Sequence, residues 1–172
     1  MNQYELLLNI SKNALVTLSN LLDKGSAYAE EKGIDESVLL TASLAPDMFN
    51  FTKQIQVSTD DARRNLFLLS GKEHIKMEDT ETTFAELQER VKKTKEIIDS
   101  LTVADFEGAD DRHISLYWMG GAYVLGKDIV SQLAIPNLLF HVVTAYDILR
   151  AQGVPLGKSD YIVNLKMQQP GA

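Results

Sequence analysis

The chain has 172 residues, 45% of them hydrophobic, and a formal net charge of −7 at pH 7. A chain of this size can bury a substantial core, so we expect one domain over residues 1–165 and a frayed C-terminal tail at 166–172. The acidic balance argues against binding to nucleic acid or to an anionic membrane. Because the chain has no cysteine, disulfides, thiolate nucleophiles and cysteine-ligated metals are excluded.

The N-terminal segment carries charge early and lacks the pattern of a signal peptide. No uninterrupted apolar run reaches the ~18 residues that a membrane-spanning helix needs. We therefore expect a cytoplasmic protein without a membrane-spanning segment.

Helical spacing of apolar residues runs through the first part of the chain. Residues 3–31 carry one apolar stripe, and Gly33 follows as a natural helix end. Asp35 can cap a short helix over residues 35–44. The sequence therefore predicts a long first helix followed by a short second one.

A second long helix is predicted from Pro46 to about residue 69, because proline and the following Asp47 both suit a first helical turn. Asp47, Gln54 and Asp61 follow one another at intervals of seven, so they share one edge of this helix. That edge is a candidate polar flank of the core. A solvated face is the alternative.

The third long helix begins near a capping-box pattern formed by Thr83 and Glu86 and runs to about Ser100. The acidic loop 102–111 lacks the spacing of a calcium-binding EF-hand. After it, residues 112–125 are rich in β-branched and aromatic types around a Gly-Gly pair, which predicts a β-hairpin.

The fourth long helix is predicted from Pro136 to Gly153, after a short helix that Asp128 can cap. Tyr161 and Ile162 are expected to pack against the bundle. Four long amphipathic helices predict an all-α four-helix bundle, with a small β-hairpin insert between helices three and four.

His141 is a single histidine on the apolar row of the fourth helix. Asp47 or Gln54 can meet it if helices two and four are neighbours, and such a pair can act as a general base or contribute to a metal site. A core histidine satisfied by hydrogen bonds is the alternative. Tyr146 can donate a proton or hydrogen bond, and Arg150 can hold an anionic group. Packing and a surface ion pair are the alternatives for those two residues.

A catalytic zinc site normally has three protein ligands, and the chain has three histidines in all. Ala145, one turn after His141, cannot be a ligand, and His74 and His113 lie in segments predicted to be non-helical. We therefore predict no metal site and no cofactor. His141 is the candidate ligand if zinc or nickel binds.

Three segments carry a resemblance to a known family: LAPDMF at 44–49 with Gln54, DTETTFAEL at 79–87, and PNLLFHVVTAYDILRAQGVPLGKSDYI at 136–162. Together they resemble the DUF1993 family over nearly the whole chain. That family is similar in fold to the DinB/YfiT-like superfamily of four-helix bundles. The resemblance implies a metal site built from one histidine on helix two and a His-x-x-x-His pair on helix four, and in some members thiol-dependent transferase activity. His141 is comparable to one histidine of the pair, but Ala145 breaks it and helix two has no histidine.

Two functions follow from these observations. The first is a binding module for a small molecule or a protein partner, expected as a homodimer and without the three-histidine site. The second is an acid/base or metal-assisted enzyme, a DinB-like transferase or hydrolase, that uses His141 and Asp47 with Tyr146 or Arg150 orienting the substrate. The incomplete ligand set favours the binding module.

Overall fold

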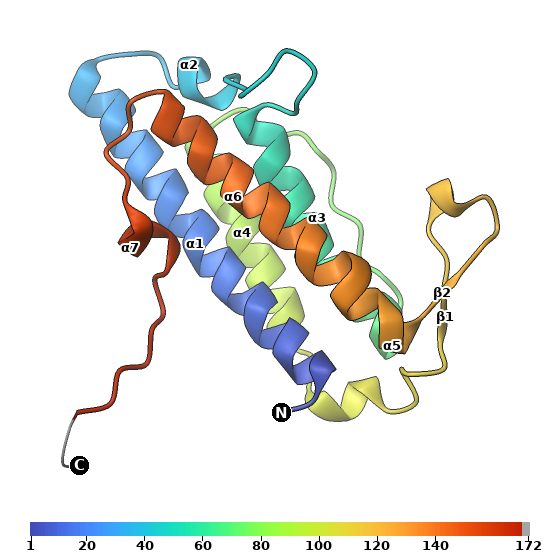
Figure 1. Cartoon of the computed structure of the whole chain (residues 1–172). Helices are drawn as coiled ribbons and strands as arrows, with labels where there is room; N and C mark the ends of the chain where they lie inside the picture. Colours follow the sequence, from blue (N-terminus) through green and yellow to red (C-terminus); the bar gives the residue numbers. More distant parts are fainter. Residues whose placement is uncertain (170–172) are drawn as a thin grey trace.

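Four long helices lie side by side in the computed structural model (Figure 1), which describes residues 1–169. They are α1 (Gln3–Lys32), α3 (Phe51–Ser70), α4 (Phe84–Asp99) and α6 (Ile135–Ala151). The short helices are α2 (Ser37–Leu40), α5 (Gly126–Ile129) and α7 (Lys158–Tyr161), with 3-10 turns η1 (Val103–Phe106) and η2 (Tyr117–Met119). The prediction of an all-α bundle with a small hairpin between its third and fourth long helices is confirmed.

The four helices form a ring in which α1 and α3 each pack against both α4 and α6. The starts of α3 and α4 meet where the rings of Phe51 and Phe84 lie 6.0 Å apart. Further along both helices, Arg90 Nε donates to Thr59 Oγ1 over 2.7 Å. Since α3 and α4 therefore run in the same direction, the link 71–83 must return along the bundle between them.

Several helix ends follow the sequence signals. Gly33 ends α1 in the left-handed conformation with φ of 61°, which glycine adopts without strain. Thr83 and Glu86 form the predicted capping box of α4. Inside α1, a Cβ added to Gly25 would lie 2.8 Å from the ring of Phe84, so this glycine allows α1 and α4 to approach closely.

The second long helix begins at Phe51 and not at Pro46. Asn50 is its N-cap, and the Asn50 Oδ1 atom accepts a hydrogen bond from the backbone N–H of Lys53 over 2.9 Å. Pro46 and Asp47 lie in the irregular turn before it, and Asp47 is exposed. The predicted start was wrong because asparagine at the cap satisfies a free helical N–H, whereas Pro46 belongs to the preceding turn.

The fourth long helix does not restart at Pro136. Helix α5, a π-helical segment η3 (Val130–Ala134) and α6 follow one another without a break. A proline inside a regular α-helix clashes with the carbonyl four residues earlier, and the wider π turn lies where that clash would arise. Asp128 lies within the first turn of α5, whose N-cap is Leu125, so the predicted cap was also wrong.

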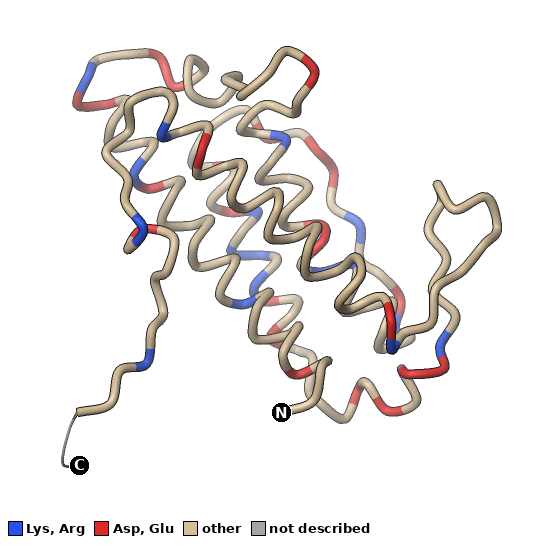
Figure 2. Tube along the Cα trace, in the orientation of Figure 1, with Lys and Arg blue, Asp and Glu red and all other residues tan. Residues whose placement is uncertain are grey.

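The continuous helix Gly126–Ala151 is long and apolar enough to cross a membrane by length and composition alone. Figure 2 shows α6 as a long stretch with few charged residues. One face of α6 packs into the core of the bundle, with Leu138, Val142, Ala145, Ile148 and Leu149 among its buried side chains. The hydropathy of this helix is therefore that of a core helix.

The predicted hairpin is present but short. Strands β1 (His113–Ile114) and β2 (Val124–Leu125) pair antiparallel, with His113 opposite Leu125. The hairpin projects from one end of the bundle (Figure 1). The turn η2 occupies residues that were expected in the first strand.

Helix α7 lies beside α1 (Figure 1). Tyr161 is half-buried, as predicted, whereas Ile162 is 51% exposed and does not pack as expected. Residues 166–169 of the predicted tail 166–172 are exposed, and residues 170–172 lie outside the described part of the chain.

Candidate functional site

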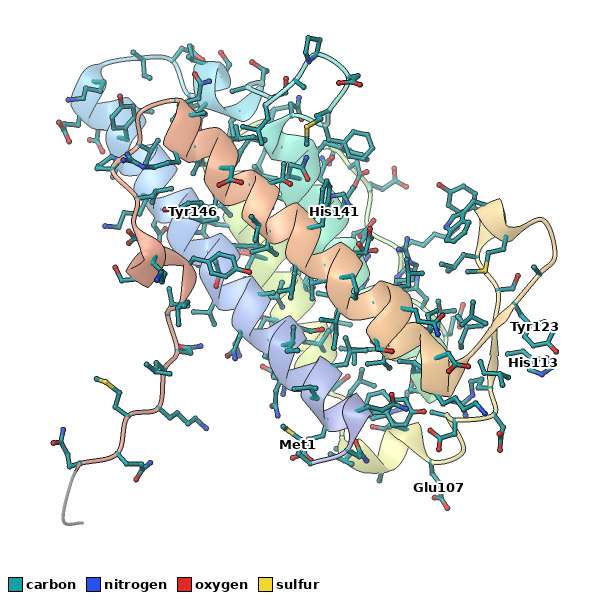
Figure 3. All side chains as sticks on the ribbon, viewed as in Figure 1. Met1, Glu107, His113, Tyr123, His141 and Tyr146 are labelled. Atoms are coloured by element: carbon teal, nitrogen blue, oxygen red, sulfur yellow. The ribbon has the colours of Figure 1, made fainter. Side chains whose placement is uncertain are left out.

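His141 points from α6 toward the seam between α6 and α3 (Figure 3) and is 8% exposed. Its Nδ1 atom lies 2.7 Å from Gln54 Oε1 on α3. Of the two partners that the sequence offered, Gln54 makes this contact. The histidine thus faces the bundle interior, as predicted, and joins the second and fourth long helices.

The hydrogen bonds of Gln54 define the state of the His141 ring. Gln54 Nε2 donates to the carbonyl oxygen of Phe49 over 3.2 Å, so Gln54 Oε1 is the acceptor for His141 and Nδ1 carries the proton. Burial lowers the pKa of His141, and the charge of Arg64 lowers that pKa further. The ring is therefore neutral near pH 7 and carries its lone pair on Nε2.

Two exposed phenylalanines flank this ring. Phe49 lies 6.4 Å from His141 between ring centroids, nearly parallel, and Phe140 lies 5.2 Å away, edge to face. Phe49 is 51% exposed and Phe140 is 55% exposed. Within residues 1–169, Gln54 is the one hydrogen-bond partner of the ring, so Nε2 remains available between apolar walls.

Asp61 is a buried carboxylate on the same seam, two turns after Gln54 on α3. One of its oxygens accepts from Arg64 and the other from Asn137 on α6. Burial raises the pKa of Asp61 to about 6, although Arg64 and the Asn137 hydrogen bond both lower that pKa. Asp61 therefore gains or loses its proton at a pH at which most proteins remain folded.

Arg64 is the partly exposed arginine of this seam. Its side chain is 33% exposed, it pairs with Asp61, and its charge acts on the His141 ring. Its Nε atom is buried and has no hydrogen-bond partner within the described residues. We call the five side chains that meet here the α3/α6 cluster: Gln54, Asp61, Arg64, Asn137 and His141.

Three residues predicted for the site lie elsewhere. Asp47 is exposed in the turn before α3, whereas His141 is bonded to Gln54, the other partner that the sequence offered. Tyr146 leaves α6 on the side opposite to His141 (Figure 3) and packs edge-on against Tyr161, 6.3 Å away. Arg150 is exposed and donates to the carbonyl of Val154 over 3.4 Å. The pairing of His141 with Asp47 was therefore wrong.

Sequence reasoning missed Asn137 and Arg64. Asn137 lies one turn before His141, so the two share a face of α6, and this spacing was a usable signal. Asp61 was placed on the correct edge, together with Gln54, but was not chosen as a site residue. Arg64 follows Asp61 by three residues, the spacing of a helical ion pair.

The cluster does not fit a divalent metal ion. The metal-binding pattern implied by the DinB-like resemblance has three histidines, whereas this seam offers one, together with two amides and one carboxylate. No group of three or more His, Cys, Asp or Glu side chains within residues 1–169 could hold a metal. Arg64 also places a positive charge against the single carboxylate of the cluster.

The comparisons with known proteins agree with this fold. A search of curated proteins gives no match. A solved structure of a DinB family member protein from Shewanella denitrificans is 35% identical, with a TM-score of 0.92. The match covers 99% of this chain and 100% of that chain.

A family model also matches most of the chain. It is described as a domain of unknown function, DUF1993, and it matches residues 3–162. This range includes all four long helices and the α3/α6 cluster. The chain therefore belongs to the DUF1993 family and has the DinB-like helical-bundle fold.

Proposed function

We propose that this protein binds a small molecule at the α3/α6 cluster. His141 Nε2 accepts a hydrogen bond from the ligand, and Phe49 and Phe140 form apolar walls on either side. The observation that carries the proposal is the hydrogen bond from His141 Nδ1 to Gln54, which leaves the lone pair on Nε2.

General physical reasons support this assignment. Ligand sites are commonly apolar surfaces with a few fixed polar groups that give orientation. A buried histidine whose second nitrogen is held by a protein acceptor keeps its tautomer without further cost on binding. Two large exposed phenylalanines beside such a ring form an apolar surface that a ligand would cover.

Phenol tests the proposal because it combines a hydroxyl donor with a flat apolar ring. We expect phenol to shift the NMR signals of the His141 ring nitrogens, while toluene, which lacks the hydroxyl, shifts Nε2 much less. His74 and His113 are internal controls in the same spectrum. A phenol titration that leaves His141 unchanged would contradict the proposal.

A second candidate function is acid/base catalysis. It is favoured by the same tautomer, because a neutral histidine with a free Nε2 lone pair is the form that a general base needs. Hydrolysis of p-nitrophenyl acetate is a suitable assay: the rate should fall at least about tenfold in His141→Ala if the histidine acts as a base. His113→Ala is the control for unspecific hydrolysis by surface imidazoles.

We also propose a cytoplasmic homodimer, as related bundles often are. Light scattering should then give a mass near twice the chain mass of 19.2 kDa. A mass equal to that of one chain across a wide concentration range would contradict the dimer.

A further inference from the structure

We infer that the side chain of Arg64 supplies the positive charge of the α3/α6 cluster. The site therefore binds an anionic group of its ligand and excludes divalent metal ions. This inference rests on the proposed function, because the anionic group belongs to the small molecule proposed above. The ligand class is a flat apolar acid that also carries a hydrogen-bond donor.

The first step is the position of the polar side chains. Asn137 and His141 are four residues apart on α6, so they share one face of that helix. Asp61 reaches the same seam from α3 and bonds Asn137. Two polar residues of α6 therefore contact polar residues of α3, Asn137 at Asp61 and His141 at Gln54.

The second step is that these donors are oriented against a metal ion. Asn137 turns its Nδ2 donor, and not its carbonyl oxygen, toward Asp61. The other oxygen of Asp61 is bound by the guanidinium of Arg64, which keeps its charge at every accessible pH. A metal ion would have to displace both partners and would be repelled by Arg64.

The third step is that Arg64 has donors to spare. A guanidinium has five N–H donors in a planar fork, and in this structure one terminal nitrogen serves Asp61. Nε is buried, so a ligand can reach only the donors in the exposed third of the side chain. A carboxylate or phosphate can take up such donors, because planar forks match these anions.

The charges around Arg64 permit such an anion. Asp61 is the carboxylate that pairs with it from the same helix, and the positive charge of Arg64 helps to keep the His141 ring neutral by lowering its pKa. The neighbouring Asp60 directs its carboxylate to Arg63 and Arg90 on the α4 side of α3. The anionic group of a ligand would therefore lie near one carboxylate, that of Asp61, whose charge is already paired with Arg64.

Three probes of similar shape separate the possible charge preferences: phenol, 4-hydroxybenzoate and 4-hydroxybenzylamine. Near neutral pH, we expect 4-hydroxybenzoate to bind about tenfold more tightly than phenol, and the amine to bind more weakly than phenol. Arg64→Met should lose the preference for the carboxylate while still binding phenol, and Arg64→Lys should keep part of it. Equal affinity for phenol and the carboxylate would overturn the inference and leave the proposed function intact. No binding of any of the three would overturn both.

Nickel alone tests the second half of the inference by calorimetry. The wild-type protein should show no stoichiometric binding, and Asn137→His should bind nickel only weakly. The double variant Asn137→His with Arg64→Met should gain at least about tenfold in nickel affinity over Asn137→His, because the repelling charge is gone. Stoichiometric nickel on the wild type that is lost in His141→Ala would overturn the inference. So would a double variant, folded by circular dichroism, that binds nickel no better than Asn137→His.

Discussion

Helix α3 carries a polar cluster on each of two sides, and the two clusters differ in how completely they are satisfied. On the side of α4 lies the Arg63–Arg90 cluster, in which Arg63 and Arg90 are 0% and 1% exposed. Asp60 bridges them, with one carboxylate oxygen 2.6 Å from Arg63 and 2.9 Å from Arg90. On the side of α6 lies the α3/α6 cluster, whose arginine is partly exposed.

The Arg63–Arg90 cluster ties the link 71–83 to the bundle. Arg63 Nε donates to His74 Nε2 over 3.3 Å. Arg90 donates to Glu81 over 3.0 Å and to the carbonyl of Glu78 over 2.9 Å. Because α3 and α4 are parallel, the link must run back along them, and these hydrogen bonds hold it in place.

The difference between the clusters suggests that the Arg63–Arg90 cluster stabilises the fold and that the α3/α6 cluster binds a ligand. A polar cluster whose donors all have protein partners stabilises one arrangement of the chain and offers nothing to a ligand. A cluster with an unpartnered donor, an available lone pair and exposed aromatic neighbours retains the capacity to bind. The following experiments test this contrast.

The largest effect is expected for Arg90→Met. Removing this arginine takes the ion-pair partner from Glu81 in the link and leaves Asp60 with Arg63 alone, so unfolding should become easier by about 3–5 kcal/mol. Urea denaturation measures the change. Lys92→Met, on an exposed position of the same helix, is the matched control and should cost less than about 0.5 kcal/mol. A loss below about 1 kcal/mol for Arg90→Met would show that the link does not depend on this cluster.

The next effect concerns the pH dependence of stability through Asp61. Burial raises the pKa of Asp61 from 3.8 to about 6, so the folded protein takes up this proton more readily than the unfolded chain. Its contribution to stability is fully present below the unfolded value and is lost as the pH rises through the folded one. The stability of the wild type relative to Asp61→Asn should therefore fall by about 2–3 kcal/mol as the pH rises through this window.

Denaturation curves at a series of pH values measure this difference. Asp147→Asn, an exposed position on α6, is the control and should follow the wild type. If the difference in unfolding free energy between wild type and Asp61→Asn stays constant with pH, Asp61 is not the titrating group of the α3/α6 cluster.

A smaller effect is expected at Gln54. Gln54→Leu leaves the Nδ1 proton of His141 without an acceptor and should cost about 1–2 kcal/mol. Gln54→Glu supplies a carboxylate instead, which favours the charged ring and should raise the pKa of His141 by at least about one pH unit. Urea denaturation measures the first change and an NMR titration the second, in which His74, on the opposite side of α3, should titrate as in the wild type. An unchanged pKa of His141 in Gln54→Glu would contradict the assigned hydrogen bond.

The sequence predicted the helices and their ends better than it predicted the α3/α6 cluster. Apolar spacing predicted four helices because each buries one stripe, and Gly33 and the Thr83 capping box marked ends by local chemistry alone. The interval of seven placed Gln54 and Asp61 on one edge of α3, next to the helix that carries His141. These features depend on residues close together in the chain.

The missed features depend on distant contacts. Both Pro46 and Asn50 are reasonable helix starts, and the turn before α3 decides between them: Phe51 N–H bonds the carbonyl of Ala42 over 2.9 Å. Arg64 has the sequence pattern of a solvated charge until Asp61 is known to be buried. Asn137 lies just beyond Pro136, where the sequence suggested a helix start and the structure has a continuous helix.

The smallest effect on stability and the sharpest on binding should come from Phe140→Ala. The side chain is 55% exposed, so its loss should change the free energy of unfolding by less than about 0.5 kcal/mol. Its ring lies 5.2 Å from His141, so removing one wall should weaken phenol binding by about three- to tenfold. Trp118→Ala is the matched control, because Trp118 is 58% exposed in the hairpin and should leave phenol binding unchanged. If Phe140→Ala instead destabilised the fold by about 2 kcal/mol or more, the phenylalanine would belong to the packing of the bundle. The α3/α6 cluster would then be a structural cluster like the Arg63–Arg90 cluster on the other side of α3.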